Sequence, residues 1–575
     1  MRQLLSGVAA ARGCALGRAR MRLPHRLEIE VSTIAADAVA AEIARFRAAV
    51  AEVRAEMRAL RERLQGALAS ELGDFVDLHA LLLDDPELLS GIDTLIRTGP
   101  YSADYALRLQ RNRITAAFEE MDDAYLRSRI DDIDHIIERL HGALHNRKAA
   151  LPGVSGDILI TDNIAPAELA LLQAQGVVGV VTAAGSPLSH STIMARSLHL
   201  PLVVGASQAL LKARDGDVLL LDGGSGLVIL EPDAADLRAH HARVTQVRQE
   251  RRQLNRLRRE PSRTLDGVDI KLWANAETRD DASEAHALGA AGIGLFRSEF
   301  LFLGRGELPD EETQFRAYRD VVLAMTGRMV TIRTLDLGAD KAERSGLALR
   351  QEANPALGLR GVRLSLALAG MLRTQLRAIV RASGYGPVRV LIPMLSGIEE
   401  LQAVRSSLDN AMRELRAEGR EIAAKVPLGT MIEVPAAALA LPSFLKLADF
   451  LAIGSNDLVQ YLLAADRTNE ALEALYTPLH PAVLRVLHDV TRTARRRGVP
   501  VTLCGEIAAE PAFAPLLLAL GLDELSLHPS HLLEVRQAIR GCELTRLRAD
   551  APALLRARTR AGIERWLDAH RSAKH

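Results

Sequence analysis

The feature that most constrains the fold is a series of short apolar runs in the second half of the chain. Each run is bounded by turn residues and followed by a segment with helical periodicity. Eight strands that alternate with helices over some 300 residues predict a (β/α)8 barrel, and a doubly wound open sheet is the structural alternative. The runs are Ile270–Ala274, Ile293–Phe296, Met329–Thr334, Val388–Pro393, Leu428–Ile432, Phe450–Ile453, Val501–Cys504 and Glu524–Leu527.

The first half of the chain has a different texture and predicts a multidomain α/β protein. Residues 1–20 hold glycines among small apolar residues and predict a short strand and turn segment, and residues 148–231 alternate short apolar runs with helical segments, which predicts a compact α/β unit. Residues 21–147, from about residue 33 onward, contain few glycines and prolines and show helical spacing of apolar residues, which predicts a helical bundle. We expect a charged linker helix over 232–262 and the barrel over 263–575.

Composition excludes several functional classes. Lys and Arg total 72, as do Asp and Glu, so no net charge favours binding to nucleic acid or to a membrane surface. The three cysteines are too scattered for a disulfide framework or a zinc knuckle. The N-terminus lacks the apolar core of a signal peptide, and no stretch is long enough to span a bilayer. We therefore expect a soluble, cytoplasmic protein.

A histidine stands at the start of a predicted helix. The Gly/Ser/Pro-rich loop from Ala183 to Ser189 delivers His190, and the helix continues through Leu198. A helix N-terminus offers unpaired N–H groups and a positive dipole end, and we expect Ser191 and Thr192 to add hydroxyl donors. Such a site suits a histidine that carries a phosphoryl group. The alternative is a helix-capping Ser-His pair with no chemical role.

Polar side chains recur at one place in the predicted barrel, the C-terminal ends of the strands. In a barrel these ends converge on one mouth, where the active site lies. Arginines can bind phosphate and carboxylate groups, paired carboxylates can hold Mg²⁺, and a positioned thiol can donate a proton. Taken singly, such an arginine is more simply a surface ion pair and such a cysteine a packing residue. The residues are Arg297, Arg333, Glu433, Asn456, Asp457 and Cys504.

The histidine motif adds a family resemblance. The run from Gly185 to Arg196, followed by Leu200–Gly205, resembles the phosphohistidine signature of Enzyme I of the bacterial sugar phosphotransferase system. Pyruvate phosphate dikinase and phosphoenolpyruvate synthase share that signature. The chain departs from it at 186–188, where the family often has Gly-Arg-Thr, and at Leu169, where a hydroxyl residue is common.

The resemblance implies an activity and a role for each residue. The chain would transfer the phosphoryl group of phosphoenolpyruvate to His190 and then to the phosphocarrier protein HPr, releasing pyruvate. Cys504 would protonate the enolate, Glu433 and Asp457 would bind Mg²⁺, and the barrel would form a homodimer. The residues implied to bind phosphoenolpyruvate are Arg297, Arg333, Asn456, Asp457 and Arg467. Further matches run from Asp336 to Lys341, with Ala339 in place of a usual glycine, and from Asn354 to Arg363.

The resemblance also implies that residues 1–20 and 148–231 form one phosphohistidine domain, and that residues 21–147 are a helical subdomain inserted in it that binds HPr. The contacts with the partner are less closely specified. The segment from Glu71 to Leu88 resembles the docking helices for the carrier, with His79 and the acidic residues as candidate contacts. A regulatory, nitrogen-type paralogue remains an alternative. A dikinase or synthase is a weaker one, because only about 150 residues of largely helical sequence precede the histidine domain. A non-catalytic regulator would be expected to lack His190, Cys504 or a metal ligand.

Overall fold

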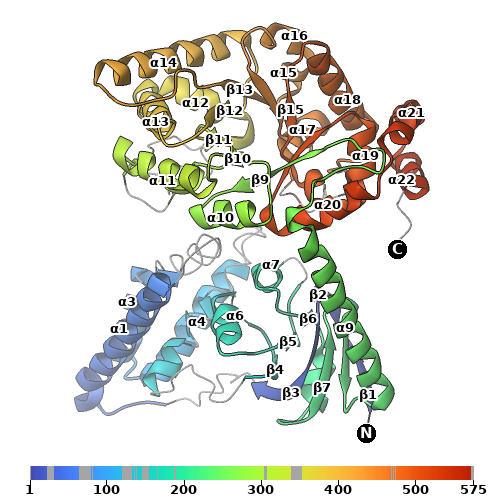
Figure 1. Ribbon diagram of the computed structural model, residues 1–575. Coiled ribbons are helices and arrows are strands. Elements are labelled where there is room, and N and C mark those ends of the chain that lie inside the picture. The colour runs from blue at the N-terminus through green and yellow to red at the C-terminus, as the bar shows by residue number, and fades with distance from the viewer. Residues whose placement is uncertain are drawn as a thin grey trace. The chain divides into compact units, whose positions relative to one another are not determined.

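The protein is described by a computed structural model in which the chain forms two compact units, Met1–Arg248 and Gln249–His575 (Figure 1). The structure describes residues 2–22, 32–63, 79–80, 82–83, 85–119, 133–134, 136–137, 139–145, 155–164, 166–186, 189–303, 307–338, 347, 352–467, 469, 472 and 474–570.

An eight-stranded mixed sheet organises the N-terminal unit, with strand order β1-β8-β7-β3-β4-β5-β6-β2. Alternate residues of β4 enter two different cores: Leu159 packs towards α6 and α7, while Ile158 and Ile160 pack towards α8. Helices therefore cover both faces of the sheet. Its strands are β1 Gln3–Ser6, β2 Val8–Ala11, β3 Cys14–Arg22, β4 Asp157–Thr161, β5 Gly179–Thr182, β6 Leu202–Val204, β7 Val218–Asp222 and β8 Leu227–Leu230.

The helices of this unit form because apolar residues recur at helical spacing. In α1, the side chains of Ile43, Phe46, Val50, Val53 and Met57 are all buried, and they form one stripe on the helix. The stripe packs in the same core as buried residues of α3 and α4. The helices are α1 Val39–Arg63, α3 Pro86–Thr98, α4 Ala103–Glu119, α6 Pro166–Ala174, α7 His190–Ser197, α8 Ser207–Lys212 and α9 Ala234–Arg256.

A closed barrel of eight parallel strands organises the C-terminal unit, in the order β9 to β16 with β16 paired to β9. The closure confirms the predicted (β/α)8 barrel and rules out the open sheet. The barrel strands are β9 Lys271–Ala276, β10 Ile293–Phe296, β11 Val330–Arg333, β12 Val388–Ile392, β13 Leu428–Ile432, β14 Phe450–Ile453, β15 Val501–Leu503 and β16 Glu524–Leu527.

Helices surround the barrel strands, as Figure 1 shows for α11, α13, α14 and α18. They pack on the strands through one continuous apolar core. The barrel helices are α10 Arg279–Ala287, α11 Glu311–Ala324, α12 Gly361–Ala367, α13 Ala369–Ala382, α14 Ile398–Ala417, α15 Pro435–Leu439, α16 Leu441–Phe444, α17 Ser455–Leu463, α18 Pro481–Arg496, α19 Ala514–Ala519, α20 Leu532–Arg540, α21 Leu544–Leu555 and α22 Arg560–His570.

A buried polar layer lies inside the barrel. The guanidinium carbon of Arg389 lies 4.0 Å from the ring centroid of Phe450 and 4.8 Å from that of Trp273. Glu524 accepts hydrogen bonds from Trp273 Nε1 at 3.1 Å and Thr502 Oγ1 at 3.0 Å, and from Lys271 Nζ at 2.9 Å. The interior is therefore filled with side chains and is not a pore.

Within the described part of the chain, none of the helices combines the length and apolar character that a bilayer crossing requires.

Candidate active site

The predicted polar residues lie at or just beyond the C-terminal ends of five barrel strands. Because all eight strands are parallel, these ends share one mouth of the barrel. Arg333 is the last residue of β11, and Arg297, Glu433 and Cys504 directly follow β10, β13 and β15. Asn456 and Asp457 lie in the first turn of α17, which begins two residues after β14.

Asp336 joins two arginines at this mouth. Its Oδ2 lies 3.2 Å from Arg333 Nη1, and its Oδ1 lies 3.1 Å from Arg360 Nη2. Arg333 Nη2 also contacts Glu299 Oε1 at 3.0 Å. Burial by itself lowers the pKa of Arg333, but the carboxylates of Glu299, Asp336, Glu433 and Asp457 outweigh it and raise that pKa. Both arginines are held as cations before any ligand binds.

Glu433 is completely buried at the same mouth. Its Oε1 accepts a hydrogen bond from the backbone N–H of Met394 at 2.6 Å. Burial, with Asp336 and Asp457 close by, raises the pKa of Glu433 to about 8, although Arg333 opposes the shift. Among the described residues, neither Glu433 Oε2 nor Asp457 Oδ1 has a hydrogen-bond partner, although both atoms are buried. Such oxygens are expected to meet a cation or a proton.

Cys504 is 5 % exposed and packs in an apolar cluster inside the barrel with Leu391, Met431 and Phe450. Burial raises the pKa of its thiol to about 12, against the opposing effect of the arginines around it, Arg389 first among them. The group therefore carries its proton at neutral pH. A protonated thiol can donate to carbon, as the predicted role requires.

Three other predicted residues lie towards the rim. Arg297 pairs with Glu277 at 2.9 Å, and its side chain is 44 % exposed. Asn456 exchanges two hydrogen bonds with Glu506: its Nδ2 donates to Oε1 at 2.9 Å, and its Oδ1 accepts from the Glu506 N–H at 3.0 Å. The backbone N–H of Arg467 donates to Gln460 Oε1 at 3.2 Å. The mouth thus has two largely buried arginines, Arg333 and Arg360, that carboxylates hold in place, and more exposed arginines at its rim.

The histidine loop lies in the N-terminal unit. Helix α7 begins at His190, and the preceding Ser189 caps it, accepting a hydrogen bond from the Thr192 N–H at 3.3 Å. The hydroxyls of Ser191 and Thr192 donate to the carbonyls of Ile164 at 2.5 Å and Ser186 at 2.9 Å. The expectation that they are available as donors is therefore wrong in this structure, because both stabilise the loop instead.

Some predicted residues lie outside the described part of the chain. They include 71–78, 81 and 84 of the proposed docking segment, and Ala339 to Lys341 of the second barrel motif. His79 is described and is 1 % exposed, so its ring is a core group in this structure and not an accessible contact. The prediction of a docking role for His79 fails for that reason.

Sequence reasoning did not assign roles to Glu299, Asp336, Met394, Arg360 or Tyr461. Asp336 and Arg360 lie within the two further stretches that match the family, Asp336 to Lys341 and Asn354 to Arg363, and that match could have identified them as site residues. Tyr461 Oη lies 3.4 Å from Arg360 Nη1, and the carboxylates of Asp336 and Glu299 hold the arginines.

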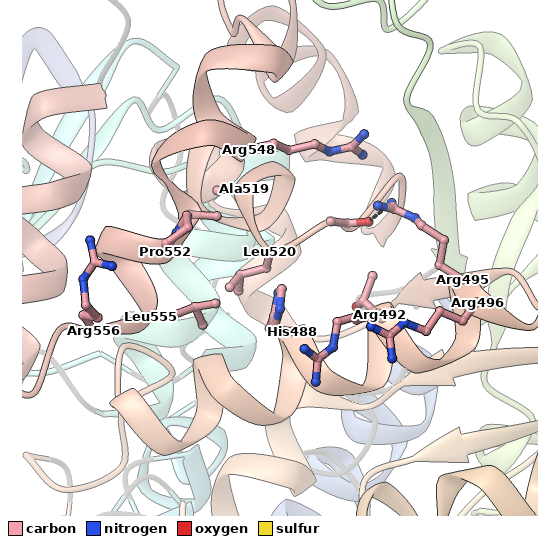
Figure 2. A pocket seen from close by; sticks show the side chains of 13 residues that line it. His488, Arg492, Arg495, Arg496, Ala519, Leu520, Arg548, Pro552, Leu555 and Arg556 are labelled. Atoms are coloured by element: carbon pink, nitrogen blue, oxygen red, sulfur yellow. Dashed lines mark hydrogen bonds between the residues drawn. The ribbon is translucent and has the colours of Figure 1, made fainter.

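A separate cavity of about 710 Å³ lies on the outer ring, between α18, α19 and α21 (Figure 2). Leu520, Pro552 and Leu555 form apolar parts of its wall, with arginines around them. None of the predicted site residues lines it, so it is distinct from the barrel mouth.

Family models of PEP-utilising enzymes match three successive stretches of the chain. The family model described as "PEP-utilising enzyme, PEP-binding domain" matches residues 251–544. The models for the "N-terminal" and "mobile domain" regions of PEP-utilising enzymes match 6–129 and 153–226. Here PEP is phosphoenolpyruvate.

Several curated relatives carry the name phosphoenolpyruvate-protein phosphotransferase. One from Cupriavidus necator is 43 % identical over 566 residues, covering 96 % of this chain and 97 % of the relative. One from Geobacillus stearothermophilus is 39 % identical over 539 residues and covers 93 % of both chains. One from Staphylococcus aureus is 36 % identical, covering 94 % of this chain and 95 % of the relative. With three domain models matched in order and identity of this extent, the chain belongs to the phosphoenolpyruvate-protein phosphotransferase family.

Proposed function

We propose that this enzyme moves the phosphoryl group of phosphoenolpyruvate to His190 and then to an HPr-type phosphocarrier, as the first step of sugar phosphotransfer. The observation that carries the proposal is the charge arrangement at the barrel mouth. Two arginines fixed by Asp336 lie close to the carboxylates of Glu433 and Asp457, each of which has a buried oxygen without a hydrogen-bond partner among the described residues.

This arrangement fits a substrate that carries both a phosphate and a carboxylate. Arg333 and Arg360 supply planar donors for such anions, and Arg297 is free to change partner because its ion pair is exposed. Pre-formed ion pairs at Arg333 limit how far that side chain must move when substrate arrives.

The residues also fit Mg²⁺. Glu433 Oε2 and Asp457 Oδ1 are hard oxygen ligands, both buried and both without a partner among the described residues. Glu433 would have to lose its proton on binding, since burial raises its pKa. When bound, the ion would neutralise charge on the phosphoryl group and on the enolate.

The transfer balances in atoms and protons. The bond from phosphorus to the enol oxygen breaks while a bond from phosphorus to a ring nitrogen of His190 forms. The enolate takes the Cys504 proton at its methylene carbon to give pyruvate, and water returns a proton to the thiolate. His190 must reach the barrel mouth for the first step and leave it for the second, which makes the linker helix α9 the candidate hinge.

The test is labelling with phosphoenolpyruvate that carries a radioactive phosphate, with and without Mg²⁺. We expect acid-labile, Mg²⁺-dependent label on the protein that His190→Ala abolishes. His199→Asn is the matched control: His199 is exposed near the far end of α7, and asparagine tolerates its positive φ of 53°. Undiminished label in His190→Ala would contradict the proposal.

A second stage identifies the carrier. Labelled protein is offered equal amounts of a sugar-type HPr and of a nitrogen-type paralogue, and the initial transfer rates are compared. Faster transfer to the sugar-type carrier supports the proposed pathway, whereas faster transfer to the paralogue would assign the enzyme to regulation. Light scattering with and without ligand tests the expected homodimer.

A further inference from the structure

Three ligand-type side chains meet in the helical part of the N-terminal unit, away from the histidine loop. Asp104 lies in the first turn of α4, His141 lies in the helical residues 139–144, and His145 is the turn residue directly after them, four positions from His141. Positions four apart share one face of a helix, so both imidazoles can point at the same group. One donor atom from each of the three residues lies within 4.8 Å of the other two.

The two separations between Asp104 and the imidazoles are close to those of tetrahedral coordination. His145 Nε2 lies 3.0 Å and His141 Nε2 lies 3.6 Å from the same atom, Asp104 Oδ1. Zinc binds histidine nitrogen and carboxylate oxygen at about 2.0–2.2 Å in tetrahedral sites, which places neighbouring ligand atoms roughly 3.3–3.6 Å apart. The His141 separation of 3.6 Å lies at the upper limit of that range, and a small side-chain rotation would bring the His145 separation of 3.0 Å into it.

The other oxygen of Asp104 is already occupied. Arg45 Nη2 donates to Oδ2 at 3.0 Å, and Arg45 also pairs with Glu42, whose Oε1 lies 2.8 Å from the same nitrogen. This contact orients the carboxylate so that Oδ1 faces the imidazoles, as outer contacts commonly do for metal ligands. Glu42 balances the charge of Arg45, which would otherwise oppose a cation.

Solvent can reach the cluster. The exposed fractions of the side chains are 14 % for Asp104, 17 % for His141 and 39 % for His145. The two imidazole centroids are only 4.6 Å apart. Rings this close can both bind one divalent ion through a nitrogen atom.

We propose that Asp104, His141 and His145 bind a Zn²⁺ ion, with water as the fourth ligand. The ion links α4 to helical residues 139–144 and stabilises the helical part of the unit. Two nitrogens and one carboxylate oxygen favour Zn²⁺ over Mg²⁺, which prefers an all-oxygen shell. The proposal is independent of the phosphotransfer reaction.

The test is a Zn²⁺ titration of the full-length, chelator-treated protein by calorimetry, in excess Mg²⁺ so that hard carboxylate sites are filled. We expect the double variant His141→Ala/His145→Ala to bind one Zn²⁺ fewer than the parent. Single variants should bind at that site at least about tenfold more weakly, since loss of an outer contact alone costs about that much. His145→Cys should retain binding, because thiolate is also a zinc ligand.

The matched control is His240→Ala/His241→Ala. His240 and His241 are consecutive residues of α9, so their side chains do not share a helix face. Their ring centroids are 5.8 Å apart. This variant should bind as the parent does, and far-ultraviolet circular dichroism should show that all variants are folded. Zn²⁺ should raise the unfolding temperature of the parent but not of the double variant. Equal stoichiometry in the parent and in the folded double variant would overturn the proposal.

Discussion

Alkylation of Cys504 should be slow and strongly pH-dependent in the folded enzyme. The thiol is 5 % exposed, and burial raises its pKa to about 12 from the reference value of 9.0. Only the thiolate reacts with iodoacetamide. A rise of about three pKa units therefore lowers the thiolate population at pH 7 about a thousandfold.

A more basic thiolate is also a better nucleophile, so each thiolate reacts faster and this offsets part of the fall in the thiolate population. With a Brønsted coefficient of about 0.4–0.5, three pKa units raise the intrinsic reactivity roughly 15- to 30-fold. The net expectation is alkylation about 30- to 60-fold slower than in the unfolded chain. Steric exclusion slows it further without altering its pH dependence.

The assay measures modification of each cysteine by peptide mass spectrometry between pH 7 and pH 10, in native and denaturing buffers. We expect the native rate at Cys504 to rise about tenfold per pH unit throughout, while the rate in denaturant levels off near pH 9. Cys542 is the matched control, because burial also raises its pKa to about 12 but it lies between α20 and α21. Phosphoenolpyruvate with Mg²⁺ should protect Cys504 alone. A native rate at Cys504 that levels off below pH 9 would refute the reasoning.

Three further predictions concern the barrel mouth. A Cβ at Gly454 would lie 2.6 Å from Glu433 Oε2, so Gly454→Ala should lower the free energy of unfolding by about 1–3 kcal/mol, as urea denaturation would measure. Gly370→Ala is the control: open space surrounds that position, so the substitution should not destabilise the protein. Arg333→Met removes the cation that pairs with the largely buried Glu299 and Asp336, although Asp336 keeps its pair with Arg360, and should cost about 3–5 kcal/mol. Arg297→Met loses only an exposed pair and should cost less than about 1 kcal/mol; equal costs would contradict this view of the site. Glu433→Gln resembles the protonated carboxyl group and should fold normally, but Mg²⁺ should no longer raise its unfolding temperature, as a thermal scan would show.

The barrel strands could be predicted because they are buried on both faces and so form continuous apolar runs. The sequence ranges for β10, β13, β14 and β16 coincide with the observed strands. β9 differs, since it extends through Asn275 to Ala276. Asn275 accepts a hydrogen bond from Ser526 Oγ at 2.6 Å, and a polar residue paired inside the barrel cannot be recognised from hydrophobicity alone.

The site was less predictable wherever contacts join separate elements. Arg333 and Asp336 are only three positions apart, but Arg360 reaches Asp336 from 24 positions further along the chain, at the start of α12. Periodicity and apolar runs do not encode that second contact. His79 was predicted as an accessible contact but is 1 % exposed. The sequence from Glu71 to Leu88 contains both acidic and apolar residues, and periodicity alone did not show that this ring is buried.

The side-chain hydrogen bonds between β9 and β16, the first and last barrel strands, have a consequence for folding during translation. Lys271 and Trp273 of β9 bond to Glu524 of β16, and Lys271 and Glu524 are 253 positions apart in sequence. A ribosome adding roughly 5–20 residues per second needs about 13–50 seconds to emit the intervening chain. During that interval β9 lacks its β16 neighbour, while the N-terminal unit, already synthesised, can fold around its own cores. Nascent barrels are therefore exposed to edge-to-edge pairing with one another, and chaperone capture during translation would protect this enzyme most before β16 emerges.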